Sequence, residues 1–307
     1  MNWTSDNIPS QQGRTIIVTG ASGGLGRSTT IELARKQAKI IMAVRNVDKG
    51  EQVADEIRSQ QPDADIHVMK LELSSLDAIK TFAEAFRAEN NQLDLLINNA
   101  GIYDNKGRKT EDGFALVMGV NHLGHFALTG HLIDLLLATP SSRVVTVSSS
   151  ALRSAQLDLE TFHAGPNDTY GASKLANALF ASELHRRLGT LDTNTISVTS
   201  LPGASKTDSV EKLIQSQNVV LRRILDSLSD TIMQKPNMGA LPNLRAATDP
   251  QAQGGQFYGV TGFGGFRGYP DVVQPSKKSE DVDMASGLWE RSVELTGVNF
   301  VALDGTK

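Results

Sequence analysis

The amino-acid sequence predicts an α/β protein with a doubly wound parallel sheet and helices on both faces. Short unbroken runs of apolar and β-branched residues alternate with amphipathic stretches, and no linker interrupts them. The predicted strands cover residues 15–20, 39–44, 65–73, 93–98, 143–149 and 195–201. The predicted helices include residues 26–36, 47–60 and 75–89 and a helix through "NDTYGASKLANALF" (167–180).

Length and composition fit one globular domain. The chain has 307 residues, of which 39% are hydrophobic and 21% are charged, and its net charge of −4 gives no basic footprint for nucleic acid. It contains no cysteine, which excludes disulfides and thiol catalysis and suits a cytoplasmic location. The polar N-terminus predicts no signal peptide, and no apolar run reaches the roughly 18 residues of a membrane span.

We expect this single domain to have three parts. Residues 14–207 would form the nucleotide-binding and catalytic core, residues 208–250 a helical substrate lid, and residues 251–307 a C-terminal strand and tail. The alternation of strands and helices stops at Pro202, after which Gly, Pro and polar residues increase. We expect this last third at the carboxyl edge of the sheet, where open α/β sheets bind their ligands.

A glycine-rich loop, "TGASGGLG" (19–26), follows the first predicted strand. Gly20, Gly24 and Gly26 permit a tight turn and let backbone N–H groups approach a pyrophosphate, to which the next helix N-terminus adds partial positive charge. The spacing differs from the GxGxxG fingerprint, so a turn that only packs the helix on the sheet stays open as the alternative. The position of the loop between strand and helix favours a phosphate site.

The second strand ends in "MAVRN", which bears on the choice of cofactor. A site specific for NAD typically places Asp or Glu here to hold the ribose 2′-hydroxyl, whereas this chain has Val44 and Arg45. A guanidinium suits a 2′-phosphate, so the sequence predicts NADP(H). The alternative is a solvated surface arginine.

Tyr170 and Lys174 lie four residues apart, which places them on one face of the predicted helix, with small residues between them. A tyrosine with a pKa of about 10 needs a shift of about 3 units, or roughly 4 kcal/mol, to exchange protons near neutral pH. An ammonium at about 4 Å supplies about that much at an effective dielectric near 20. The pair therefore predicts acid/base chemistry in a partly desolvated cleft.

The sequence resembles the short-chain dehydrogenase/reductase family, specifically its retinol-dehydrogenase-like branch. The ordered motifs that carry the resemblance run from about Arg14 to Thr207 and are TGASGGLG, VRN, NNAG, NHLGHF, VSSS, YGASK and LPGASKT. The resemblance implies a Rossmann-type fold and an oxidoreductase that acts on a carbonyl or alcohol group of a small molecule.

Catalytic roles follow from the same resemblance. Tyr170 would be the acid/base, Lys174 its partner, Ser149 the hydroxyl that polarises the carbonyl, and Asn121 the residue that supports a proton relay. The choice between Ser149 and its neighbours Ser148 and Ser150 stays open. The implied cofactor site comprises Gly20, Ser22, Gly24, Leu25, Gly26, Arg45, Glu72, Leu73, Asn98, Ala100, Gly101, Tyr170, Lys174, Pro202, Gly203 and Thr207.

The segment 209–233 follows the PG motif and carries apolar residues at helical spacing. These residues are Val210, Leu213, Ile214, Leu221, Ile224, Leu225, Leu228 and Ile232. We predict a lid that closes on a bulky, lipophilic substrate. A helix packed permanently on the sheet or on a second subunit of a homo-oligomer stays open as the alternative.

Two other functions and a metal site fit these motifs less well. A non-enzymatic NADP-sensing regulator on the same fold has no need of Ser149, Tyr170 and Lys174, all of which are present. A double-bond reductase resembling light-dependent protochlorophyllide reductase would carry a cysteine near NNAG, and this chain has none. His122 and His125, three residues apart, lack an Asp or Cys to complete a metal site, so we expect packing roles and no metal.

Overall fold

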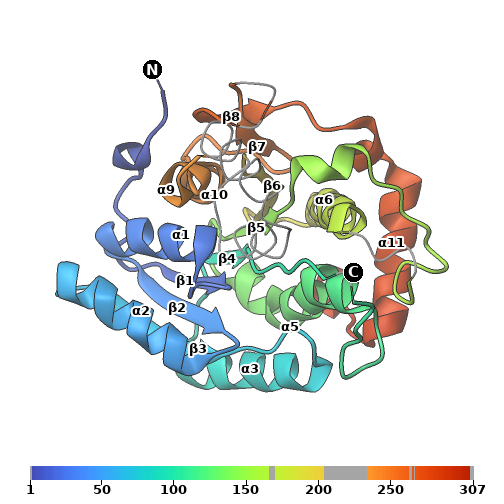
Figure 1. The fold of residues 1–307 in the computed structure, drawn as a ribbon, viewed down its shortest axis with the longest axis horizontal. Helices are drawn as coiled ribbons and strands as arrows, with labels where there is room; N and C mark the ends of the chain where they lie inside the picture. Colours follow the sequence, from blue (N-terminus) through green and yellow to red (C-terminus); the bar gives the residue numbers. More distant parts are fainter. Residues whose placement is uncertain are drawn as a thin grey trace, which may run out of the picture.

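The computed structural model describes residues 2–104, 106–165, 170–203, 234–262, 265 and 267–304. The strands of this part are β1 (Thr15–Thr19), β2 (Lys39–Val44), β3 (Asp65–Lys70), β4 (Leu95–Asn98), β5 (Arg143–Val147), β6 (Ile196–Leu201), β7 (Phe257–Val260) and β8 (Pro270–Val273). They form one sheet in the order β3-β2-β1-β4-β5-β6-β7-β8, which is parallel except for antiparallel β8 at one edge (Figure 1). The predicted doubly wound sheet is therefore confirmed, with one antiparallel edge strand in addition.

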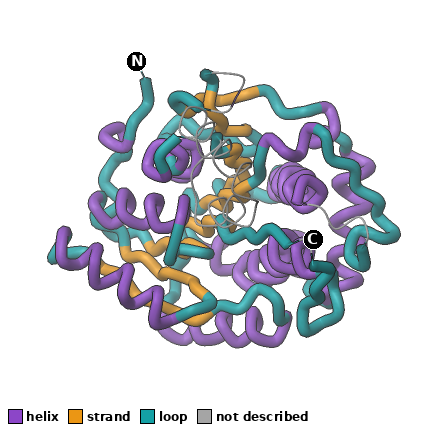
Figure 2. Tube along the Cα trace, viewed as in Figure 1, coloured by secondary structure: helices purple, strands orange, loops and turns teal. Residues whose placement is uncertain are grey.

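Helices cover both faces of the sheet, as Figures 1 and 2 show. The α-helices of the described ranges are α1 (Gly24–Arg35), α2 (Val47–Gln60), α3 (Leu76–Glu89), α4 (Leu116–Met118), α5 (Gly124–Ala138), α6 (Tyr170–Leu188), α9 (Pro236–Gly239), α10 (Leu241–Thr248) and α11 (Val282–Thr296). A π-helical segment, η2 (Gly119–Leu123), leads into α5, and 3-10 turns include η3 (Ser150–Arg153).

Strand alternation sorts the core into two layers. In β1, Ile16 and Val18 point to the face covered by α1, α2 and α10, whereas Ile17 points to the face covered by α3 and α5. All five residues of β1 are buried, as expected of a parallel strand covered on both sides. This sandwich holds the carboxyl ends of the strands in fixed positions.

Helix boundaries follow local capping chemistry. The Asn46 side chain accepts a hydrogen bond from Lys49 N–H at 2.9 Å and starts α2 at the predicted residue. Asp281 caps α11 in the same way through Met284 N–H, and Gly297, with φ +67°, ends that helix. The third predicted strand, 65–73, ends earlier, at Lys70.

The C-terminal third differs from the prediction in two places. Residues 251–307, for which we expected one strand and a tail, form β7, β8 and the long helix α11. Residues 241–248, assigned to the lid region, form α10, whose Leu244 is fully buried in the core on the α1 side of the sheet. The amphipathic patterns in this part of the sequence are short, so they do not by themselves predict these elements. Tertiary packing determines where the strands and helices form.

The predicted lid 209–233 lies outside the described residues, as does Thr207. None of the helices in the described ranges has the length and apolar character that crossing a membrane requires.

Candidate active site

The site lies where the strand order reverses, between β1 and β4. Parallel strands on either side of this point send their following loops in opposite directions, which opens a crevice at the carboxyl edge. The segments that follow β1, β4, β5 and β6 carry the glycine loop, NNAG, the serines and the PG motif. The fold therefore brings the predicted site motifs to one edge of the sheet.

The glycine loop has the geometry of a phosphate cradle. Gly20 has φ +67°, and a Cβ there would lie 3.0 Å from Cα of Ala100. A Cβ on Gly26 would lie 2.4 Å from the carbonyl oxygen of Gly20, so α1 packs directly on the turn. The N-cap residue of α1 is Gly23, which has no side chain to cap the helix, so the N–H groups of its first turn can bind an anion. Ser22 lies within this turn and Leu25 in the first turn of α1.

The residues expected near the adenosine end of the cofactor differ in exposure and in hydrogen bonding. Arg45 is exposed directly after β2. The Glu72 carboxylate accepts hydrogen bonds from Ser74 N–H at 3.1 Å and from the Ser74 hydroxyl at 2.7 Å, and Leu73 is buried. The side chain of Asn98 is fully buried and donates to the Thr129 hydroxyl at 3.1 Å.

Thr19, which the sequence analysis missed, organises the NNAG segment. Its hydroxyl accepts from the N–H groups of Asn99 and Ala100, both at 2.9 Å, and lies 2.9 Å from His125 Nε2. His125 Nδ1 lies 3.0 Å from the Asn121 carbonyl oxygen, so Nδ1 carries the proton and Nε2 accepts from Thr19. Burial lowers the His125 pKa to about 4 and keeps the ring neutral. The sequence signal for this role of Thr19 is its polar side chain at the end of an apolar strand.

Asn121 joins the NNAG segment to α6. Its Oδ1 accepts from Ile102 N–H at 2.8 Å, and its Nδ2 donates to the Ile102 carbonyl and to Ser173 Oγ, each at 3.0 Å. Asn121 lies in the π-helical segment η2, and such segments occur often at functional sites. The backbone of Gly101 lies nearby, since a Cβ there would be 3.3 Å from Lys174 Nζ.

The serine that faces Tyr170 is Ser149. The Ser149 hydroxyl interacts with the Tyr170 phenol and acts to lower its pKa. Ser148 is buried and donates to the Lys174 backbone carbonyl at 2.6 Å, so its hydroxyl is already engaged. Ser150 begins η3, outside this pair.

Lys174 lies beneath the tyrosine and is almost fully buried. Its Nζ is 5.5 Å from the centre of the Tyr170 ring and donates to the Val147 carbonyl at 3.0 Å. Burial lowers the Lys174 pKa from 10.5 to about 8. Tyr170 and Lys174 therefore lie on the same face of α6, as predicted.

The net pKa shift of Tyr170 is opposite to the one expected. From the sequence, we expected Lys174 to lower the pKa of Tyr170. In the structure, burial raises the Tyr170 pKa above its usual value, and the Ser149 hydroxyl opposes this rise. Tyr170 and Lys174 are both buried away from water, and this desolvation disfavours the charged form of each side chain.

Pro202 and Gly203, which we expect near the nicotinamide end of the cofactor, lie at the carboxyl end of β6, with Pro202 buried. Asn243 of α10, which no sequence signal indicated, accepts from the Ser200 hydroxyl at 2.6 Å and donates to Asn99 Oδ1 at 3.3 Å. This contact ties α10 to the floor of the site.

The two histidines have packing roles. His122 is buried, lies 3.0 Å from Ser292 Oγ through Nε2, and contacts Phe126, Phe162 and Phe180. The described ranges contain no group of His, Cys, Asp and Glu side chains arranged to hold a metal.

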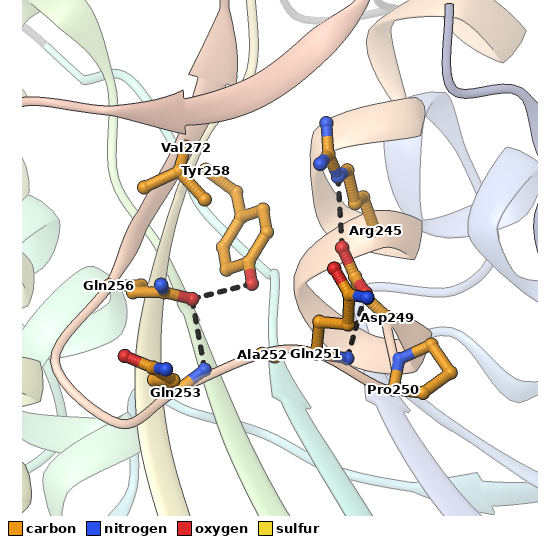
Figure 3. Close-up of a pocket in the computed structure, with 9 residues that line it drawn as sticks. All are labelled: Arg245, Asp249, Pro250, Gln251, Ala252, Gln253, Gln256, Tyr258 and Val272. Atoms are coloured by element: carbon orange, nitrogen blue, oxygen red, sulfur yellow. Dashed lines mark hydrogen bonds and ion pairs between the residues drawn. The ribbon is translucent and has the colours of Figure 1, made fainter. Parts of the chain in front are cut away.

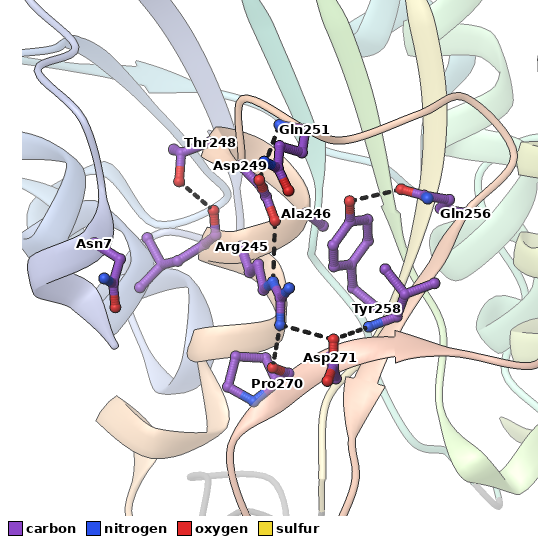
Figure 4. A network of polar contacts seen from close by, with 12 residues as sticks. Asn7, Arg245, Ala246, Thr248, Asp249, Gln251, Gln256, Tyr258, Pro270 and Asp271 are labelled. Atoms are coloured by element: carbon purple, nitrogen blue, oxygen red, sulfur yellow. Dashed lines mark hydrogen bonds and ion pairs between the residues drawn. The ribbon is translucent and has the colours of Figure 1, made fainter. Parts of the chain in front are cut away.

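A separate hollow of about 660 Å³ lies at the opposite, amino-terminal edge of the sheet, between the end of α10 and the start of β7 (Figure 3). Tyr258 donates to Gln256 Oε1 at 2.8 Å on one side of it. On the other side, Arg245 binds Asp249 at 3.0 Å and reaches Asp271 at 3.0 Å (Figure 4). These pairings tie α10 to edge strand β8, which is a structural role.

The chain is similar to known proteins in sequence and in fold. A family model described as short chain dehydrogenase matches residues 14–218. Retinol dehydrogenase 13 from Homo sapiens is 34% identical over 294 residues, covering 93% of this chain and 85% of that protein. Polyprenol dehydrogenase from Mus musculus is 34% identical over 307 residues, covering 97% and 88%. The crystal structure of an uncharacterized protein from Mycobacterium Paratuberculosis is 35% identical, covers 98% of this chain and 99% of that chain, and superposes with a TM-score of 0.80.

Proposed function

The chain belongs to the short-chain dehydrogenase family, in its retinol-dehydrogenase-like branch, and on this premise we propose an NADP(H)-dependent oxidoreductase of lipophilic carbonyl and alcohol substrates. The observation that carries the proposal is the Lys174 ammonium 5.5 Å from the centre of the Tyr170 ring, with the Ser149 hydroxyl acting on the same phenol. An acid, a hydrogen-bond donor and a buried cation at the edge of a nucleotide crevice suit carbonyl reduction.

The residues of the chain supply the proton and the electrostatic support. In the direction of reduction, a hydride adds to the carbonyl carbon while the carbonyl oxygen takes the phenolic proton of Tyr170. Ser149 donates to the oxygen on which negative charge develops, and Lys174 stabilises the phenolate left behind. When bound, NADPH supplies the hydride. Oxidation of an alcohol reverses these steps, with the Tyr170 phenolate accepting the proton.

The raised pKa of Tyr170 bears on its protonation state. The phenol is protonated at neutral pH, which is the form that carbonyl reduction requires. Lys174, with a pKa of about 8, is mainly charged at pH 7 and loses its proton above pH 8. Support for the phenolate therefore weakens as the pH rises through about 8.

The cofactor assignment is supported by the cradle and by Arg45. Gly20 and Gly26 let the turn pack tightly against the NNAG segment and α1, and the N–H groups at the start of α1 would bind the pyrophosphate. Arg45 is exposed beyond β2 and can hold a 2′-phosphate. Asn98 enters this assignment only through its backbone, because its side chain binds Thr129.

The lipophilic substrate is inferred from relatives named for retinol and polyprenol. The cytoplasmic location and a homo-oligomer stay predictions. A non-enzymatic sensor is the second candidate, and it requires that purified protein bind NADPH without turnover.

The experiment measures NADPH and NADH oxidation with a panel of aldehydes and ketones. We expect turnover with NADPH, and Arg45→Asp should weaken NADP(H) binding by about 2–3 kcal/mol because it removes a charge-assisted bond and adds like charge. NADH binding should change little. Lys80→Asp on α3, another exposed cation, is the matched control. Preference of the unmutated protein for NADH, or equal losses for both cofactors, would refute the NADP(H) assignment.

A further inference from the structure

The segment after NNAG exposes an aromatic ring beside the acid/base residue. Tyr103 is 52% exposed, and its ring centre lies 6.3 Å from that of Tyr170, with the planes inclined by 58°. Apolar ring surface exposed beside a reactive group is a common feature of binding sites. The other large hydrophobic residues that are exposed in the described ranges are Tyr269, Val272, Val282 and Val301.

The residues on both sides of Tyr103 make hydrogen bonds. On one side, both backbone groups of Ile102 bind the Asn121 amide, at 2.8 and 3.0 Å. On the other side, the Asp104 carboxylate accepts from Arg108 at 2.7 and 3.1 Å and from Lys106 N–H at 3.3 Å. The Arg108 guanidinium lowers the Asp104 pKa, so this contact persists at neutral pH.

From this geometry we propose that Tyr103 is a specificity-determining residue, whose ring face packs against the apolar chain of the substrate next to the carbonyl held by Tyr170. The inference rests on the proposed function. Removal of water from the ring and the chain would favour long apolar substrates over short ones. The phenolic hydroxyl of Tyr103 has no part in this role, since the contact uses the ring face.

The test separates the contribution of the Tyr103 ring from that of its hydroxyl. We compare wild type with Tyr103→Ala and Tyr103→Phe. For each protein, kcat and KM are measured for butanal and for decanal with saturating NADPH. We expect Tyr103→Ala to raise KM for decanal about tenfold and to leave kcat and the KM for butanal within about twofold. Tyr103→Phe should match wild type on both substrates. Val282→Ala, which truncates another exposed apolar residue, should also match it.

Three results would overturn the inference. An unchanged ratio of kcat/KM between decanal and butanal in Tyr103→Ala would show that the ring does not select chain length. A loss in Tyr103→Phe equal to that in Tyr103→Ala would assign the effect to the hydroxyl. A fall in NADPH affinity measured by fluorescence titration of Tyr103→Ala would show a structural effect. If wild type turns over neither aldehyde nor any member of the carbonyl panel, the proposed function itself fails, and this inference fails with it.

Discussion

At the level of single residues, the sequence alone does not distinguish the roles of the three consecutive serines. In the structure, Ser148 donates a hydrogen bond to the Lys174 carbonyl, Ser149 interacts with the Tyr170 phenol, and Ser150 begins a 3-10 turn. Sequence alone could narrow the choice to this segment, because a strand end at the crevice was predictable. The direction of each side chain depends on the register between β5 and α6, which only the structure gives.

Ser149→Ala should lower kcat about 10²-fold with little change in NADPH affinity, because it removes a donor to the developing oxyanion. Ser150→Ala is the matched control and should stay within about twofold of wild type. Steady-state kinetics with the preferred carbonyl substrate measures both. A loss in Ser150→Ala as large as that in Ser149→Ala would contradict the assignment.

Lys174→Met should reduce turnover but raise the free energy of unfolding at pH 7, by about 1–3 kcal/mol. The folded-state pKa of about 8 lies below the ordinary lysine value of 10.5, so below pH 8 the folded protein carries the cost of a buried charge. This cost disappears as the pH rises from 8 to 10.5, and the advantage of the variant should shrink over that range. The Val147 carbonyl keeps a donor, Asn177 Nδ2 at 3.1 Å.

Urea unfolding of both proteins at pH 7 and at pH 10 measures this effect. A variant less stable than wild type at pH 7 would mean that the hydrogen bond of the ammonium outweighs its desolvation.

At the level of elements, the sequence was informative wherever a helix or strand is long and repeats its pattern. The strand at 39–44 and the helix at 47–60 have the predicted limits, since apolar periodicity and the Asn46 cap agree there. Edge strand β8 is short and half-exposed, so its pattern is weak. The contact of Asn243 with Asn99 joins residues 144 apart in sequence, which no local pattern encodes.

Gly26→Ala should weaken NADPH binding at least about tenfold and cost about 1–3 kcal/mol of stability. The added Cβ would lie 2.4 Å from the Gly20 carbonyl oxygen and 2.6 Å from Asn99 Nδ2, so the phosphate turn must move. Gly189→Ala is the matched control, because its nearest neighbour would be at 3.4 Å. Cofactor titration and thermal unfolding measure both variants, and an unchanged NADPH affinity in Gly26→Ala would contradict the proposed cradle.

At the level of the whole molecule, α11 closes the core on the side of α5 and α6. Trp289 stacks on Phe180, with ring centres 5.8 Å apart, and meets Phe126 and Phe300 at 5.2 and 4.4 Å. The guanidinium of Arg187 lies 4.5 Å from the Trp289 ring centre. These residues come from distant parts of the chain, so the sequence could not reveal that its C-terminal part completes the core.

Trp289→Ala should destabilise the protein by about 3–5 kcal/mol through loss of burial and creation of a cavity. NADPH affinity of the folded fraction should stay near wild type, because the crevice lies at the carboxyl edge of the sheet. Glu290→Ala, an exposed neighbour on α11, should change stability by less than about 0.5 kcal/mol. Equal melting temperatures for Trp289→Ala and wild type would contradict this account of the core.

In the proposed function, the fold places the phenol of Tyr170 at the reacting oxygen, and Tyr170→Phe is the direct test of this role. The change removes the exchangeable proton and keeps the ring. Steady-state kinetics with the best carbonyl substrate should show kcat reduced by at least about 10³-fold, while titration shows NADPH binding within about threefold of wild type. A variant that keeps more than about a tenth of the wild-type kcat would show that another group delivers the proton.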